Sequence, residues 1–257
     1  MISRERLKLV RSLHQKKYRL LHKLFIAEGD KICREYLDSG LQPEGIFALK
    51  EWYSGNRGVV NIHSKISNEV TIREMEKMSA LSEPSPVLLL IRIPQREFDY
   101  LFLRNSHTLV LDQITDPGNL GTIIRTADWF GIKNLICSDD CVDLYNPKVV
   151  QASMGSMIRV RVFYFNLVSF LTGLNKMVGK PIVYGSDLTG SDILKVAFPE
   201  TTLVILGNES NGIRKDIYPF INDRVTITGK GGAQSLNVAS AAAVICHALN
   251  RQKPLQP

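Results

Sequence analysis

The second half of the chain limits the possible folds most strongly, because short apolar strands alternate regularly with helices from His107 onward. The helical segment 120–131 places Leu120, Ile123, Ile124 and Ala127 on one side and ends at Gly131. Strands are predicted at 107–113, 134–137, 158–165, 181–186, 202–206 and 224–228, and helices at 120–131, 147–153, 167–178, 212–219 and 235–249. Strands that alternate with helices predict an α/β fold with a mostly parallel sheet.

The first part of the chain has a less regular pattern. A basic helix is followed by a helix at 29–40, strands at 45–49 and 59–63, a helix at 71–81 and a strand at 85–93. We therefore expect a small N-terminal α/β domain over residues 1–95, a linker over 96–106 and a second domain over 107–257.

Charge is concentrated at the N-terminus. The whole chain carries a net charge of +7, and the segment from Met1 to Lys23 has eight Lys or Arg residues against Glu5 alone, so the remainder is neutral. A basic segment on a neutral body predicts binding to a polyanion, with nucleic acid favoured over a membrane because no strongly apolar face accompanies it. The alternative is a solvated helix that only maintains solubility.

Other features indicate the class of protein and its compartment. The longest apolar run, "VLLLIRIP", is interrupted by Arg92 and ended by Pro94, so no membrane span is expected. The N-terminus does not resemble a secretory signal, and we expect a cytoplasmic protein, with a mitochondrial presequence as the alternative. Cys137 and Cys141 have no second pair that would complete a zinc site, so reduced thiols and no metal are expected.

Three segments that follow strands are rich in Gly, Asn, Ser and Asp, namely "DQITDPGNLG", "GNESNG" and "GKGGAQSLN". In a parallel sheet, ligands bind at the carboxyl ends of the strands, where such loops lie. The chain has no G-x-G-x-x-G, G-x-S-x-G or H-E-x-x-H motif, and Ile213 and Arg214 stand where a phosphate-binding P-loop needs Lys and Ser or Thr. Arg125 lies away from the apolar side of its helix, either facing a ligand or simply exposed. Asn119 either contributes to the ligand site or caps its helix.

Three segments, "NLGTIIRTA" (119–127), "LGNESNGI" (206–213) and "SLNVASAAA" (235–243), resemble in order and spacing the motifs of the SpoU (TrmH) family of RNA 2′-O-methyltransferases, within the SPOUT superfamily. The stretches "LFIAEGDKICREYL" and "SPVLLLIRIP" are similar to the small substrate-binding domain of longer members. The resemblance implies a SPOUT-type α/β fold with a deep C-terminal trefoil knot, bound S-adenosylmethionine and a homodimer. A final helix of small Ala and Ser residues suits a place where chains cross closely.

The resemblance also implies site residues. Leu206, Gly207, Ile227 and Leu236 match positions that contact the cofactor, mostly through main-chain groups. Relatives often have Ile-Pro-Met where this chain has "ITG" at 227–229, so the chain departs from the family pattern at the position of the Met. Lys148, Arg159 and Arg161 are expected to meet RNA phosphates.

The catalytic positions implied by the resemblance are Asn119, Arg125, Glu209, Ser235 and Asn237. We expect Arg125 to hold the adjacent phosphate and to stabilise the developing alkoxide, because a guanidinium stays protonated, which makes base action by Arg125 the less favoured alternative. The other polar residues either hold the loops and the RNA or only close turns.

The function that the sequence predicts is transfer of a methyl group from S-adenosylmethionine to a ribose 2′-hydroxyl of structured RNA, with ribosomal RNA favoured over transfer RNA. The alternatives are a noncatalytic RNA-binding protein on the same scaffold, a transfer RNA 2′-O-methyltransferase, and a methyltransferase that acts on a base nitrogen.

Overall fold

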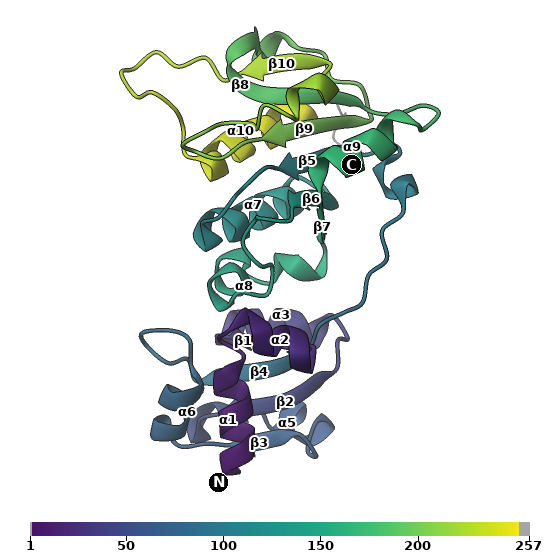
Figure 1. Cartoon of the computed structure of the whole chain (residues 1–257). Coiled ribbons are helices and arrows are strands. Elements are labelled where there is room, and N and C mark those ends of the chain that lie inside the picture. The colour runs from purple at the N-terminus through teal and green to yellow at the C-terminus, as the bar shows by residue number, and fades with distance from the viewer. Residues whose placement is uncertain (1, 252–257) are drawn as a thin grey trace. The chain divides into compact units, whose positions relative to one another are not determined.

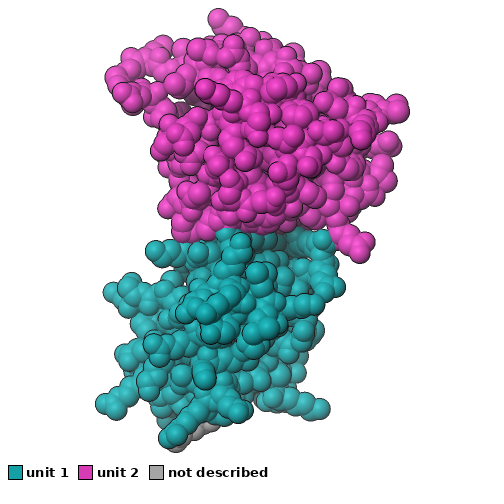
Figure 2. Space-filling model, in the orientation of Figure 1, with its two compact units in different colours: residues 1–96, 143–158 teal, residues 97–142, 159–257 magenta. Residues whose placement is uncertain are grey.

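The computed structural model describes residues 2–251, which form two compact units. One unit combines the chain up to Arg96 with the segment Asp143–Ile158, and the other combines Glu97–Val142 with the chain from Arg159 onward (Figure 2). The division expected from the sequence, at residues 95 and 107, stays a prediction. No described helix is long and apolar enough to cross a membrane.

The first unit is built around a four-stranded sheet with the order β1-β4-β2-β3 (Figure 1). Strand β4 runs antiparallel to both β1 and β2, and β3 is parallel to β2. The elements are α1 (Arg4–Ser12), α2 (Lys16–His22), β1 (Leu24–Glu28), α3 (Asp30–Asp38), β2 (Pro43–Ala48), α4 (Lys50–Gly55), α5 (Arg57–Ile62), β3 (Ser67–Glu69), α6 (Ile72–Met78), β4 (Val87–Arg92), α8 (Pro147–Ser153) and a 3₁₀ turn, η2 (Ser156–Ile158).

Three features of this unit differ from the prediction. Residues 59–63, expected as a strand, lie mostly in helix α5, where only Val60 is buried and Ile62 is 79% exposed, so the apolar residues do not alternate in burial as a sheet requires. Strand β1 was not predicted. The basic segment forms two helices instead of one, and Arg19 is only 3% exposed because its guanidinium pairs with Asp143.

The second unit contains a six-stranded sheet with the order β10-β8-β9-β5-β6-β7, in which every neighbouring pair is parallel. This confirms the predicted mostly parallel α/β fold. Its elements are η1 (Tyr100–Leu103), β5 (Thr108–Leu111), α7 (Pro117–Trp129), β6 (Asn134–Ser138), β7 (Arg161–Phe165), α9 (Leu167–Asn175), β8 (Ile182–Asp192), η3 (Ile193–Lys195), β9 (Thr202–Leu206), η4 (Tyr218–Phe220), β10 (Asp223–Thr226) and α10 (Val238–Asn250).

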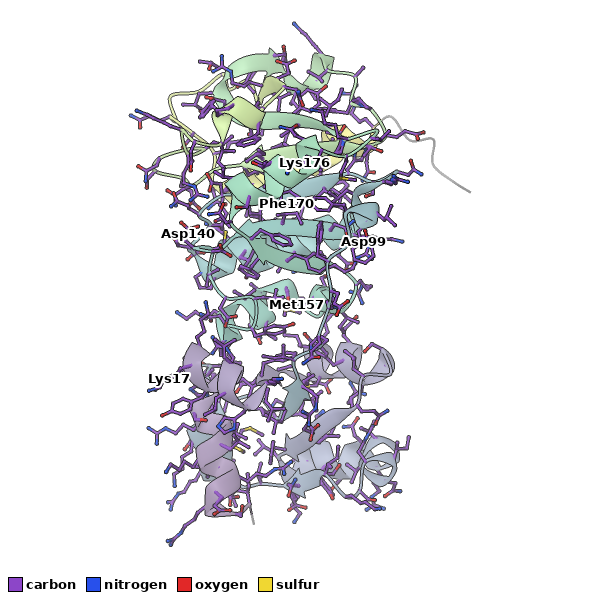
Figure 3. All side chains as sticks on the ribbon, turned by 45° about the vertical axis from the view of Figure 1, so that its right-hand side comes forward. Lys17, Asp99, Asp140, Met157, Phe170 and Lys176 are labelled. Atoms are coloured by element: carbon purple, nitrogen blue, oxygen red, sulfur yellow. The ribbon has the colours of Figure 1, made fainter. Side chains whose placement is uncertain are left out.

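The central strands β5, β6 and β9 are buried along their whole length. Helix α9 contributes Phe170 and its neighbours to an apolar cluster with residues of these strands (Figure 3), and α7 and α10 pack against each other. Phe98, from the segment expected to be a linker, stacks edge-on against Phe163, Phe165 and Phe170. The short helix expected at 212–219 is reduced to the 3₁₀ turn η4. The trefoil knot stays a prediction.

Candidate active site

The predicted site residues follow three strands of the second sheet. Asn119 and Arg125 lie on α7, which follows β5, Glu209 lies in the loop after β9, and Ser235 and Asn237 lie in the loop after β10. Because the strands are parallel, these loops leave the sheet at its carboxyl edge, where ligands of open α/β sheets bind. The fold therefore gathers the three motifs at one edge.

The start of α7 frees the Asn119 side chain for contacts outside the helix. The N-cap is Asp116, whose carboxylate accepts the Asn119 N–H at 2.8 Å, and Pro117 occupies the first helical position. Asn119 therefore does not cap its helix. Its side-chain Nδ2 instead donates a short hydrogen bond to the Glu209 carboxylate.

Asn237 joins the same cluster from the third loop. Its Nδ2 donates to Asn119 Oδ1 at 3.0 Å, while its own Oδ1 accepts the N–H groups of Ala239 and Ser240 at 2.9 and 3.4 Å as the N-cap of α10. The structure thus brings together three of the five predicted catalytic residues, Asn119, Glu209 and Asn237. We call them the amide cluster.

The other two predicted catalytic residues lie outside the amide cluster. Arg125 is six residues beyond Asn119 on α7, about 9 Å along the helix axis, on an exposed side shared with Thr122 and Trp129. In the part of the chain that the structure describes, its guanidinium has no hydrogen-bond or ion-pair partner. Ser235 is exposed in the loop before α10.

The predicted cofactor positions flank two of the loops. Leu206 ends β9, is 1% exposed, and its carbonyl accepts the Asp112 N–H at 2.9 Å. Gly207 begins a tight turn closed by reciprocal hydrogen bonds between Asn208 and Gly212, at 3.1 and 2.8 Å. A Cβ at Gly207 would lie 2.1 Å from the Gly212 carbonyl carbon, so only glycine fits. Ile227 follows β10, and Leu236 is 49% exposed.

The loop 228–236 has the properties that a nucleoside-containing cofactor needs. All its residues are exposed, and none makes a hydrogen bond within the described chain. Its peptide N–H and C=O groups are therefore available to pair with the edge of an adenine, and the exposed Leu236 side chain offers apolar contact to the base. The residues present thus fit S-adenosylmethionine.

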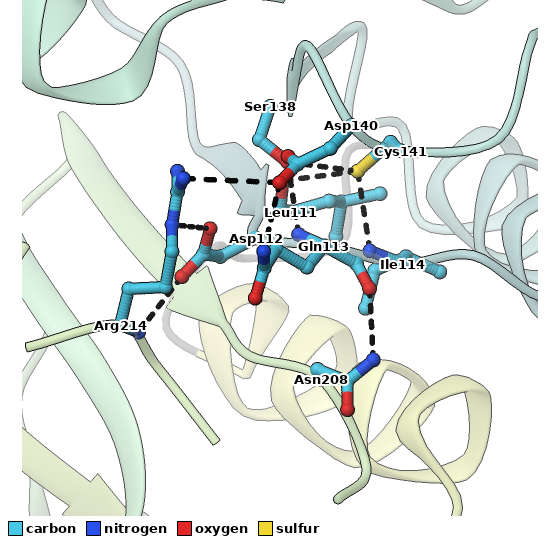
Figure 4. Close-up of polar contacts among 9 residues, drawn as sticks. All are labelled: Leu111, Asp112, Gln113, Ile114, Ser138, Asp140, Cys141, Asn208 and Arg214. Atoms are coloured by element: carbon cyan, nitrogen blue, oxygen red, sulfur yellow. Dashed lines mark hydrogen bonds and ion pairs between the residues drawn. The ribbon is translucent and has the colours of Figure 1, made fainter. Parts of the chain in front are cut away.

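A buried ion pair between Asp112 and Arg214 fixes the loop that carries Glu209 (Figure 4). The sequence analysis did not predict this ion pair. Asp112 directly follows β5 and is fully buried. Its Oδ2 accepts the Arg214 N–H at 2.9 Å, and its Oδ1 lies 2.8 Å from Arg214 Nε. Asn208 Nδ2 donates to the Gln113 carbonyl at 2.9 Å. Burial raises the pKa of Asp112, and the Arg214 N–H and guanidinium oppose that increase. The sequence does contain a signal for this residue, because Asp112 is an acidic residue placed directly after a buried strand.

Cys141 stabilises the neighbouring turn after β6. Its Sγ accepts the Ile114 N–H at 3.2 Å and lies 3.3 Å from Ser138 Oγ (Figure 4). A hydrogen bond from Cys137, followed by those from Ser138 and the backbone, lowers the pKa of Cys141 to about 7 against the effect of burial. The four cysteines are free and buried, which agrees with the expected reduced thiols.

The three cations expected at RNA phosphates belong to different elements and differ in their partners. Lys148 is exposed on α8, in the first unit, and Arg159 forms an ion pair with Asp128 at 2.8 Å, so its charge is already partnered. Arg161 begins β7, and its Nε donates to Asn134 Oδ1 at 2.9 Å.

Comparison with known proteins identifies the class. A solved structure from Porphyromonas gingivalis, assigned to the TrmH family of RNA methyltransferases, is 32% identical with a TM-score of 0.85, covering 98% of this chain and 100% of that one. An AdoMet-bound rRNA methyltransferase from Sinorhizobium meliloti is 25% identical with a TM-score of 0.83, covering 98% and 96%. The fold and the three gathered loops define an RNA methyltransferase.

The family follows from the sequence comparison. Residues 106–247 match the model of the SpoU rRNA methylase family, and the chain belongs to that family. Residues 4–89 match the MRM3-like substrate binding domain. The 23S rRNA (uridine(2479)-2′-O)-methyltransferase of Streptomyces viridochromogenes is 30% identical over 239 residues, which cover 85% of this chain and 83% of that protein. The resemblance identified in the three motifs is confirmed.

Proposed function

We propose that this protein transfers a methyl group from S-adenosylmethionine to a ribose 2′-hydroxyl of structured ribosomal RNA. The observation that carries the proposal is the amide cluster at the carboxyl edge of the parallel sheet, which joins the three family motifs beside the unpaired loop 228–236. Ribosomal RNA is favoured over transfer RNA because the Streptomyces relative, similar over most of both chains, is named for 23S rRNA.

The cofactor supplies an activated methyl group, and the chain must orient the hydroxyl for in-line transfer. Leu206, Gly207, Ile227 and Leu236 hold the cofactor through main-chain and apolar contacts. Asn119, Glu209 and Asn237 fix the loops around the reacting ribose. Ser235 adds a hydroxyl group in the loop before α10. Arg125 binds the RNA phosphate adjacent to the reacting ribose and stabilises the negative charge that develops on the ribose oxygen.

The N-terminal unit supplies the charge for RNA binding. Arg6 bonds the Glu44 carbonyl and Arg19 pairs with Asp143, so these two cations of the basic segment stabilise the fold. The six cations that stay exposed are Arg4, Lys8, Arg11, Lys16, Lys17 and Lys23. They attract phosphates and make RNA affinity fall as salt rises.

The proposal includes a homodimer in the cytoplasm. The exposed side of α7 carries Trp129, which is 84% exposed, and the neighbouring helix α10 presents partly exposed small side chains at Ala241 and Ala243. Small residues allow close helix packing, and an exposed Trp is a frequent centre of an interface. Light scattering should report twice the chain mass, and a monomer would contradict this part of the proposal.

The deciding experiment supplies radiolabelled S-adenosylmethionine, the protein and total RNA from a strain that lacks it. The labelled RNA is sized, digested and analysed for nucleosides. A 2′-O-methylated nucleoside in ribosomal RNA supports the proposal, whereas label in transfer RNA favours the transfer RNA alternative and label on a base nitrogen refutes ribose methylation. Absence of both label and cofactor binding would support the noncatalytic RNA-binding protein.

A further inference from the structure

The second unit contains a cavity of about 450 Å³ at the edge of the sheet opposite the amide cluster. Its lining comes from η1 and the turn after it, the turn between α7 and β6, the first residues of β6 and β7, and the end of α10. Strands β5, β6 and β7 all begin here, and four residues of β5 span about 13 Å, so the cavity is separate from the loops of the active site.

The lining is cationic. Arg104, Lys133 and Arg161 line the cavity, and no Asp or Glu does. Arg104 and Lys133 are exposed, and within residues 2–251 their side chains have neither a hydrogen bond nor an ion pair. Unpaired cations that converge on a concave surface attract an anion, because the low-dielectric walls strengthen the field between them.

Arg161 is held ready for such an anion. Its guanidinium carbon lies 4.1 Å from the centre of the Phe102 ring, and its Nε donates to Asn134 Oδ1 at 2.9 Å. Asn134 is fully buried and is itself fixed, because its Nδ2 donates to the Phe102 carbonyl at 2.7 Å. The stack and the two hydrogen bonds leave the terminal nitrogens of Arg161 without a partner in the described chain, in the geometry that binds two phosphate oxygens.

We propose that this cavity binds a backbone phosphate of the RNA substrate, on a nucleotide other than the one that is methylated. The proposal rests on the proposed action on RNA. The cavity volume falls in the range of small-ligand sites, large enough for one nucleotide. The side-chain amide of Asn105 also lines the cavity and adds hydrogen-bonding groups for a ribose or a base. Asn250 adds its Oδ1, because its Nδ2 donates to the Phe130 carbonyl at 2.6 Å.

The test reverses the two exposed charges, Arg104 and Lys133, and leaves the packed Arg161 in place. The variants are R104E, K133E and the double variant, and the matched control is K176E, which reverses an exposed lysine outside the cavity. Binding of ribosomal RNA from a strain that lacks the protein is measured at several salt concentrations, together with S-adenosylmethionine binding and the kcat at saturating RNA.

We expect each single variant to weaken RNA binding about tenfold and the double variant, which loses the one phosphate contact, to reduce the slope of log affinity against log salt by about one. Cofactor affinity and kcat should stay within twofold, and K176E should bind RNA as the original chain does. Unchanged RNA binding by the double variant would overturn the proposal.

Two further outcomes separate the sources of failure. If the original chain methylates RNA but the double variant binds RNA normally, the cavity proposal fails alone. If the original chain methylates no RNA and the double variant still loses RNA affinity, the proposed reaction fails and the RNA-binding cavity stands. AMP is tested as a free ligand. If the original chain binds AMP and the double variant does not, while the double variant binds RNA normally, the cavity is a site for free nucleotides and the proposal is overturned.

Discussion

Replacing Arg214 with alanine should destabilise the second unit, and the loss should depend on pH. The substitution leaves Asp112, which is fully buried, without its guanidinium partner. An unpaired buried charge costs about 3–5 kcal/mol. The cost should be smaller here, because the residue 214 N–H still donates to Asp112 Oδ2 and because the deleted side chain is 31% exposed, so water can replace it. We therefore expect a loss of about 2–3 kcal/mol at pH 8.

The sign of the pH dependence follows from the raised pKa of Asp112. In the folded protein its carboxyl holds a proton more readily than in the unfolded chain, and removal of Arg214 increases this difference. The folded state then binds more protons, so the stability of the variant relative to the original chain improves as pH falls. The deficit should be smaller at pH 5 than at pH 8.

Urea denaturation followed by tryptophan fluorescence and circular dichroism measures both effects, with K215A as the control because Lys215 is the exposed neighbour. The midpoint of thermal unfolding should fall by about 5–10 °C. The R214A loop should also hold Glu209 less firmly, so kcat should fall as well. A stability change below about 0.5 kcal/mol, or a deficit that grows as pH falls, would refute the argument that Arg214 compensates a buried charge.

Three further predictions concern the site. R125A should reduce methyl transfer steeply and leave cofactor affinity unchanged, while R125K should recover part of the rate; equal loss of transfer and cofactor binding would remove the assigned role. G207A should abolish cofactor binding, measured by calorimetry, because the new methyl group meets the Gly212 backbone; normal binding would show that this turn does not form the cofactor site. N237A should cost about 1 kcal/mol through loss of the α10 cap, whereas N237D should keep the cap and lose only the bond to Asn119, so reduced transfer by N237D without loss of stability is the expected result.

The sequence predicted the parallel sheet well because its central strands β5, β6 and β9 are buried along their whole length and its strands are bounded by turn residues. It also located the loops that bring Asn119, Glu209 and Asn237 together, since parallel strands end at one edge. The Asp112–Arg214 pair was not predicted, because a contact between residues so far apart in the chain has no local pattern.

Errors in the N-terminal unit have a similar origin. The segment 59–63 has strand-forming residues, yet the edge of the sheet is taken by Ser67–Glu69, which pair with β2. Tertiary packing therefore overrode the local preference.

The packing of α8 also has a consequence for dividing the gene into separately expressed parts. Helix α8 lies between the first and the second of the three motifs in sequence, but its Val149 and Val150 are buried in the first unit, where the helix packs on β1. A fragment starting at residue 107 would carry these side chains without the strand that covers them, and a fragment ending at residue 95 would expose the matching surface of β1. Both halves would aggregate, so domain exchange among relatives has to transfer the 143–158 segment together with the N-terminal part.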